Sequence, residues 1–103
     1  MKTFKDLTFG PHPSGEGKHA FLEFNNGRGI SVITGKYFYT SEEGPYEVGF
    51  IDKTGELGFM FLSYDKVSFM ESTEDLGDIM SGEPEGYCTE EDVTRIMEAI
   101  QKL

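Results

Sequence analysis

The stretch from residue 19 to residue 52 constrains the fold most, because apolar segments of strand length alternate along it with turn residues. Apolar side chains stand at every second position from Ala20 to Phe24, which is the period of a half-buried β-strand. The following Asn25-Asn26-Gly27 supplies residues that tolerate positive φ, as a tight hairpin turn requires. Residues 29–34 continue as a β-branched return strand. The stretch therefore predicts a curved antiparallel sheet.

Further strands are predicted beyond a turn at residues 41–45. Residues 46–52 form one strand, and residues 57–64 form its hairpin partner across a turn that Gly55 closes in the left-handed region. Residues 67–70 add a short fifth strand. The segment Leu57–Leu62 is apolar on both faces, as in a strand that is central and covered or one that forms a contact with a subunit or partner. Both interpretations remain open.

A helix is predicted near the C-terminus. Thr89 is suited to cap its first N–H groups, and Asp92 stands at the third helical position, as in a capping box. Three consecutive carboxylates also face the positive end of the helix dipole. An apolar stripe follows at helical spacing and predicts burial of one face against the sheet: Val93, Ile96, Met97, Ile100 and Leu103.

Together these elements predict one α+β domain over residues 1–103, with a curved antiparallel sheet of four to five strands packed by one C-terminal α-helix. The sheet covers about residues 19–70, an acidic loop about 71–88, and the helix about 90–102. A chain of 103 residues is long enough for a small core without disulfides. The single cysteine, Cys88, excludes an internal disulfide.

Charge is distributed unevenly along the chain. The net charge is −10, but residues 1–40 carry +2 and residues 41–103 carry −12. Nine carboxylates and no basic residue lie between Glu71 and Asp92. Such a surface repels nucleic acid and attracts basic proteins, although acidity that only confers solubility is the simpler interpretation. We expect no direct nucleic-acid binding.

Catalytic and metal-binding patterns are weak. The two histidines, His12 and His19, are separated in sequence from the one thiol, Cys88. The loop from Gly10 to His19 lacks the spacing of a phosphate-binding loop. No Cys/His cluster suits zinc, and the acidic segment lacks the ligand spacing of a calcium loop. We therefore predict a protein that is not an enzyme and binds no cofactor or metal.

Several short motifs recur in an order that resembles a known family. They are Phe4-x-Asp6-Leu7-x-Phe9, Pro11-His12-Pro13, Phe24-x-Asn26-Gly27-x-Gly29-Ile30-Ser31-Val32, Gly44-x-Tyr46-Glu47 and Gly86-Tyr87-x-Thr89-Glu90-Glu91-Asp92-Val93. The chain resembles small accessory proteins encoded by tailed bacteriophages and prophages. The resemblance implies a protein that acts in the cytoplasm of an infected bacterium, and it implies no reaction. Proteins of this class often bind and inhibit host machinery.

The leading hypothesis is a non-enzymatic protein that binds and modulates or inhibits a host bacterial protein, such as a nucleic-acid-handling or defence protein with a basic surface. Its acidic second part would supply charge, and exposed aromatic side chains would supply apolar anchors. The candidate partner-binding residues are Glu71, Glu74, Asp75, Asp78, Glu83, Glu85, Tyr37, Phe59 and Phe61.

Two alternatives belong to other classes. One is a protein that sequesters a small molecule or nucleotide in a pocket lined by aromatic strand residues and Arg28. The other is a structural protein that forms homo-oligomers through Leu57–Leu62. No run of about 18 apolar residues is present, so no membrane association is expected.

Overall fold

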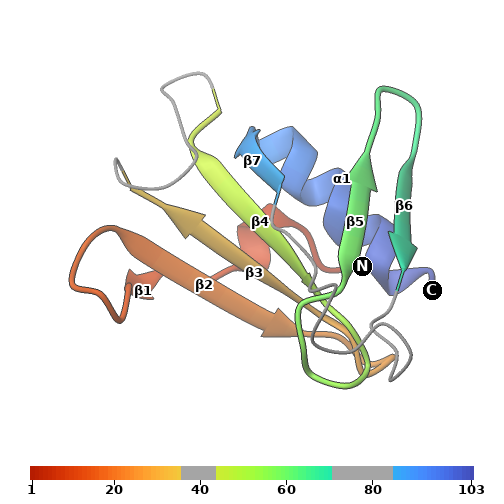
Figure 1. Cartoon of the computed structure of the whole chain (residues 1–103), viewed down its shortest axis with the longest axis horizontal. Coiled ribbons are helices and arrows are strands. Elements are labelled where there is room, and N and C mark those ends of the chain that lie inside the picture. The colour runs from red at the N-terminus through yellow and green to blue at the C-terminus, as the bar shows by residue number, and fades with distance from the viewer. Residues whose placement is uncertain (36–43, 71–84) are drawn as a thin grey trace.

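Among the described residues, the main sheet contains five antiparallel strands in the order β1-β2-β3-β4-β7 (Figure 1). The computed structural model describes residues 1–35, 44–70 and 85–103. The first four strands of the chain pair in sequence order, and the last strand, β7, pairs with β4 from a distant part of the sequence. The strands are β1 Gly10–Pro11, β2 Lys18–Glu23, β3 Gly29–Thr34, β4 Tyr46–Ile51 and β7 Glu85–Cys88.

The hairpin of β2 and β3 confirms the alternation predicted from the sequence. Ala20 lies opposite Val32, and both are buried, whereas Phe21 points to the other face and is 53% exposed. Gly27 has a φ of 83° in the turn between the two strands. The same inward face continues into β4, so that one side of the sheet carries the core. Its buried members from the strands are Ala20, Ile30, Val32, Val48 and Phe50.

The C-terminal helix α1, Glu90–Gln101, covers this inward face. The predicted capping box is present: the Asp92 N–H donates to Thr89 Oγ1 at 3.1 Å, and the Thr89 N–H donates to Asp92 Oδ2 at 3.0 Å. The predicted stripe is buried at Val93, Ile96, Met97 and Ile100. Leu103 was wrongly included, because it lies beyond the helix end and is 50% exposed.

The predicted hairpin between residues 46–52 and 57–64 is wrong. The turn forms, with Gly55 at a φ of 87°, but only Ile51 and Leu57 bridge. The Gly58 N–H then donates to Phe50 O, and a Cβ at Gly58 would lie 2.7 Å from the Phe50 ring. The glycine thus lets the chain lie directly against this ring. Beyond it, the chain forms a separate two-stranded sheet, β5 Phe59–Leu62 and β6 Val67–Met70.

This second sheet contradicts one of the two interpretations of Leu57–Leu62, whereas a contact with a subunit or partner stays a prediction. The segment is not a central covered strand, since among the residues that the structure describes β5 pairs with β6 alone. Met60 points to the core and is 7% exposed, whereas Phe61 points away and is 59% exposed. In Figure 1 the β5–β6 hairpin stands beside β4 and β7, and β6 is in contact with α1.

The predicted acidic loop covers residues 71–88, and its C-terminal boundary is wrong. Residues 85–88 form the edge strand β7, and the rest of the loop lies outside the described residues. β7 contains a bulge: Tyr46 lies opposite Cys88, and Val48 lies opposite Glu85. Within this bulge Tyr87 takes a φ of 58°, which bulky side chains rarely adopt. Gly10–Pro11 was likewise predicted as loop but pairs with β2 as β1.

Candidate functional site

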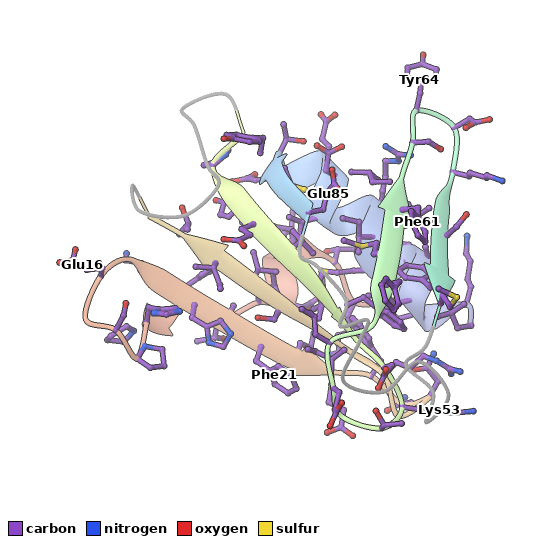
Figure 2. All side chains as sticks on the ribbon, in the orientation of Figure 1. Glu16, Phe21, Lys53, Phe61, Tyr64 and Glu85 are labelled. Carbon is purple, nitrogen blue, oxygen red and sulfur yellow. The ribbon has the colours of Figure 1, made fainter. Side chains whose placement is uncertain are left out.

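The structure describes three of the nine predicted partner-binding residues. Phe59 and Phe61 lie on β5, and Glu85 lies on β7, which is in contact with β5. Figure 2 shows Phe61 and Glu85 on these adjacent elements. The other six lie outside the described residues: Tyr37, Glu71, Glu74, Asp75, Asp78 and Glu83.

The outward face of the β5–β6 hairpin, which we call the hairpin face, carries Phe59, Phe61, Ser68 and Met70. The antiparallel register places Phe59 opposite Met70 and Phe61 opposite Ser68, so all four side chains share one side. Phe61 is 59% exposed and Met70 is 42% exposed, while Phe59 is half-buried. Tyr64, at the hairpin tip, is fully exposed (Figure 2). A large phenylalanine and a methionine therefore face solvent together.

The opposite side of the hairpin fixes this face in place. Met60, Leu62, Val67 and Phe69 pack against the core. The ring of Phe69 lies 4.7 Å from that of Phe50, centroid to centroid. Because this inner side is buried, the hairpin is part of the folded body and presents its outward face in a defined orientation.

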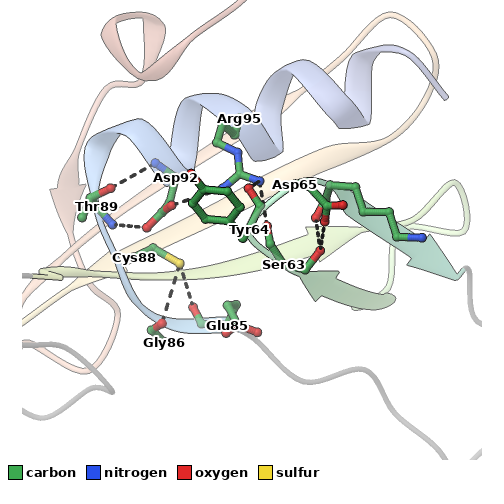
Figure 3. Close-up of polar contacts among 10 residues, drawn as sticks. Ser63, Tyr64, Asp65, Glu85, Gly86, Cys88, Thr89, Asp92 and Arg95 are labelled. Carbon is green, nitrogen blue, oxygen red and sulfur yellow. Dashed lines mark hydrogen bonds and ion pairs between the residues drawn. The ribbon is translucent and has the colours of Figure 1, made fainter.

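The hairpin tip is also tied to α1 (Figure 3). Arg95 Nη2 donates to Ser63 O at 2.8 Å and to Tyr64 O at 3.3 Å. Arg95 Nη1 lies 3.7 Å from Asp92 Oδ1, one turn earlier on the helix. Ser63 Oγ in turn donates to Asp65 Oδ1 at 3.2 Å, within the turn itself. The tip therefore costs less conformational entropy to immobilise on binding than a free loop would.

Cys88 is placed for structure and not for nucleophilic chemistry. Its side chain is 1% exposed, and Sγ donates to Glu85 O at 3.6 Å and to Gly86 O at 3.7 Å (Figure 3). Burial, together with the nearby Asp92 and Glu85 carboxylates, raises the pKa of the thiol to about 12. The thiolate, which is the nucleophilic form, is therefore scarce at neutral pH.

The two histidines form a separate pair on the outer side of the sheet. The rings of His12 and His19 lie edge to face at 6.0 Å, and His19 Nε2 is 3.0 Å from Ser31 Oγ. Burial, and then the neighbouring His12, lower the pKa of His19. β3 and β4 lie between β2, which carries His19, and β7, which carries Cys88. The cysteine and the histidines therefore do not assemble into one site.

Among residues 1–35, 44–70 and 85–103, no group of three His, Cys, Asp or Glu side chains is arranged to hold a metal ion. Sequence reasoning also missed two members of the exposed surface, Tyr64 and Met70. The sequence pattern at these two residues is weak, because Ser63 separates Tyr64 from the apolar run that ends at Leu62, and Met70 stands at a strand end. Only the strand register places Met70 opposite Phe59, on the same face of the hairpin as Phe61.

The fold and the exposed hairpin face define the chain as a small α+β protein with an apolar projection beside its main sheet. Comparisons with protein-family models, with curated proteins and with solved structures find no match to this chain. Within the part of the chain that the structure describes, no helix has the length and apolar character needed to cross a bilayer.

Proposed function

We propose that this protein is a small acidic accessory protein of bacteriophage type that binds and modulates or inhibits a host bacterial protein. The hairpin face serves as the apolar anchor of the interface, and the carboxylates of the acidic second part of the chain select a partner with a basic surface. The exposure of Phe61 on a hairpin held firmly by the core and by Arg95 is the observation that supports this function best.

Two physical properties favour a protein as the partner. Aromatic residues and methionine are enriched at protein interfaces, and a few such side chains supply most of the binding free energy. The net charge of −10 speeds encounter with a basic surface and slows encounter with an acidic one. Glu85, on the strand next to β5, brings one of these charges close to the anchor.

Affinity purification from a bacterial host lysate tests this function with two matched variants. Phe61→Ala removes the proposed anchor, and Phe21→Ala removes a phenylalanine of similar exposure from the outer side of β2 (Figure 2). A retained host protein is then purified and its affinity for each variant is measured. We expect Phe61→Ala to weaken binding by about 2 kcal/mol or more, roughly thirtyfold, and Phe21→Ala to leave it unchanged.

Ionic strength supplies the second readout. Binding that depends on the acidic surface weakens as salt rises, because the Debye length falls from about 30 Å at 0.01 M to about 10 Å at 0.1 M. An equal loss of affinity in Phe61→Ala and Phe21→Ala would contradict the proposed interface. So would an affinity that does not change with salt concentration. Light scattering on the purified protein tests the remaining alternative: a stable dimer that Phe61→Ala dissociates would assign the hairpin face to self-association.

A further inference from the structure

A second candidate site lies where the N-terminal segment meets the sheet and the start of α1. A pocket of about 540 Å³, which we call the N-terminal pocket, opens there. Its apolar wall comes from Phe4, Leu7, Phe9 and Tyr46. This volume falls in the range of about 300–1,000 Å³ that small-molecule sites occupy.

The aromatic wall is built from three rings in mutual contact. Phe4 lies 5.2 Å from Tyr46 and 5.9 Å from Phe9, and Phe9 lies 6.0 Å from Tyr46, all between ring centroids. Phe4 belongs to η1 Phe4–Asp6, a single 3-10 turn, whereas Tyr46 begins β4. The wall therefore exists only in the folded chain, which explains why sequence spacing did not reveal it.

Hydrogen bonds to α1 hold the N-terminal segment in position. The Phe4 N–H donates to Thr94 Oγ1 at 3.2 Å. The Lys2 N–H donates to Gln101 Oε1 at 2.9 Å, and Gln101 Nε2 donates back to Lys2 O at 2.8 Å. These bonds join residues near opposite ends of the chain. They keep the aromatic wall in place without help from a ligand, so a ligand would meet a largely preformed surface.

The polar residues of the pocket point to an anion. Lys5 and Lys18 both line it and are both exposed, although the protein as a whole carries −10. Local charge decides the interaction, since exposed charges farther away than about 10 Å are largely screened at 0.1 M salt. Tyr46 adds a hydroxyl whose pKa is raised by burial and by Glu90, so it keeps its proton and can donate.

Glu90 lines the same pocket from the first turn of α1. Its carboxylate offers a hydrogen-bond acceptor, and Thr34 offers a hydroxyl. An aromatic wall, two cations and an acceptor match a planar ring that carries both an amino group and an anionic group. We propose that the N-terminal pocket binds a nucleoside monophosphate with an amino-bearing base, its base against Phe9 and Tyr46 and its phosphate near Lys5 and Lys18.

This site differs from the one anticipated from the sequence. The small-molecule hypothesis included Arg28, but Arg28 lies in the turn between β2 and β3. Lys18 and Thr34 pair at the far end of the same two strands, next to the pocket. The site is also independent of the hairpin face, so either proposal can fail while the other holds.

Isothermal titration calorimetry with adenosine monophosphate tests the proposal on the intact chain. Adenosine lacks the phosphate, and inorganic phosphate lacks the ring, so we expect each to bind at least about tenfold more weakly than the monophosphate. Lys5→Ala and Lys18→Ala should each weaken monophosphate binding about tenfold or more, since each removes a charged hydrogen-bond donor from the phosphate. Lys66→Ala removes an exposed lysine from the hairpin turn and should leave the affinity unchanged.

Amide chemical shifts in titrations of the same variants locate the site. We expect the largest shifts at Phe9, Lys18 and Tyr46, and small shifts on the β5–β6 hairpin. Circular dichroism verifies that each variant is folded. No binding at millimolar monophosphate would overturn the proposal. So would equal affinity for inorganic phosphate, or an affinity that Lys66→Ala reduces as much as Lys5→Ala and Lys18→Ala do.

Discussion

Gly44 shows how one residue can fix the edge of the sheet. A Cβ at this position would lie 2.9 Å from Tyr87 Cα and closer still to the Tyr87 carbonyl group. Backbone cannot yield as a flexible side chain can, so Gly44→Ala should destabilise the protein by about 1–3 kcal/mol, as overpacking does. Chemical denaturation measures this loss. Gly10→Ala is the control, because a Cβ there meets nothing within 4 Å; equal stability of the two variants would contradict the prediction.

Cys88 should make the folded protein less stable as the pH becomes alkaline. The folded thiol keeps its proton up to a pKa of about 12, whereas an unfolded thiol loses it near 9.0. Above pH 9.0 the folded state therefore binds more protons, and the free energy of unfolding falls as pH rises towards 12. Urea denaturation at neutral and at alkaline pH should show a larger loss in the wild type than in Cys88→Ala. Tyr46 titrates in both proteins, so parallel pH profiles would exclude the thiol as the cause.

At the scale of the element, the stability of α1 depends on the hydrogen bonds of its first turn. Thr89 accepts a hydrogen bond from the Asp92 N–H and so satisfies one of the unpaired donors at the helix start. Thr89→Ala should lower the free energy of unfolding by about 1 kcal/mol, within the usual range of 0.5–2 kcal/mol. Thr89→Ser keeps the hydroxyl and should retain most of the stability. A urea midpoint that is the same for Thr89→Ala and the wild type would mean that the cap adds nothing.

Local patterns predicted elements well and their pairing poorly. The alternation around Ala20 and the stripe from Val93 to Ile100 identify which side chains face the core, because burial imposes a period on each element. No period identifies the partner of a strand. β4 pairs with β7 across a long separation in sequence, and Gly58 packs closely against Phe50 before β5 pairs with β6 outside the main sheet. Both facts depend on tertiary contacts that the local sequence does not encode.

At the scale of the whole molecule, the candidate sites differ in how far sequence reasoning could find them. Phe61 was identified because Leu57–Leu62 is apolar on both faces, and one of those faces is indeed exposed. The N-terminal pocket was not identified from the sequence, because its residues Phe4, Lys18 and Tyr46 come from three separate elements. A site within one element leaves a pattern in the sequence, whereas a site between elements appears only once the chain has folded.

The net charge of −10 should make stability rise with salt. The molecule measures 36 × 29 × 25 Å, so at 0.01 M salt, where the Debye length is about 30 Å, its charges interact across the whole molecule. The excess of acidic over basic groups makes the sum of these interactions repulsive. At 0.1 M salt the Debye length is about 10 Å, and repulsion across the molecule is screened. Each kcal/mol of repulsion that is removed should raise Tm by about 4–8 °C.

A variant with fewer charges separates this repulsion from other effects of salt. Glu16→Gln, Glu23→Gln and Glu56→Gln all change exposed side chains, and together they bring the net charge from −10 to −7. Because self-repulsion grows with net charge, the triple variant should melt at a higher temperature than the wild type in 0.01 M salt. Its Tm should also rise less steeply as sodium chloride is added. Parallel slopes for the two proteins would show that salt acts through a few local ion pairs and not through the overall charge.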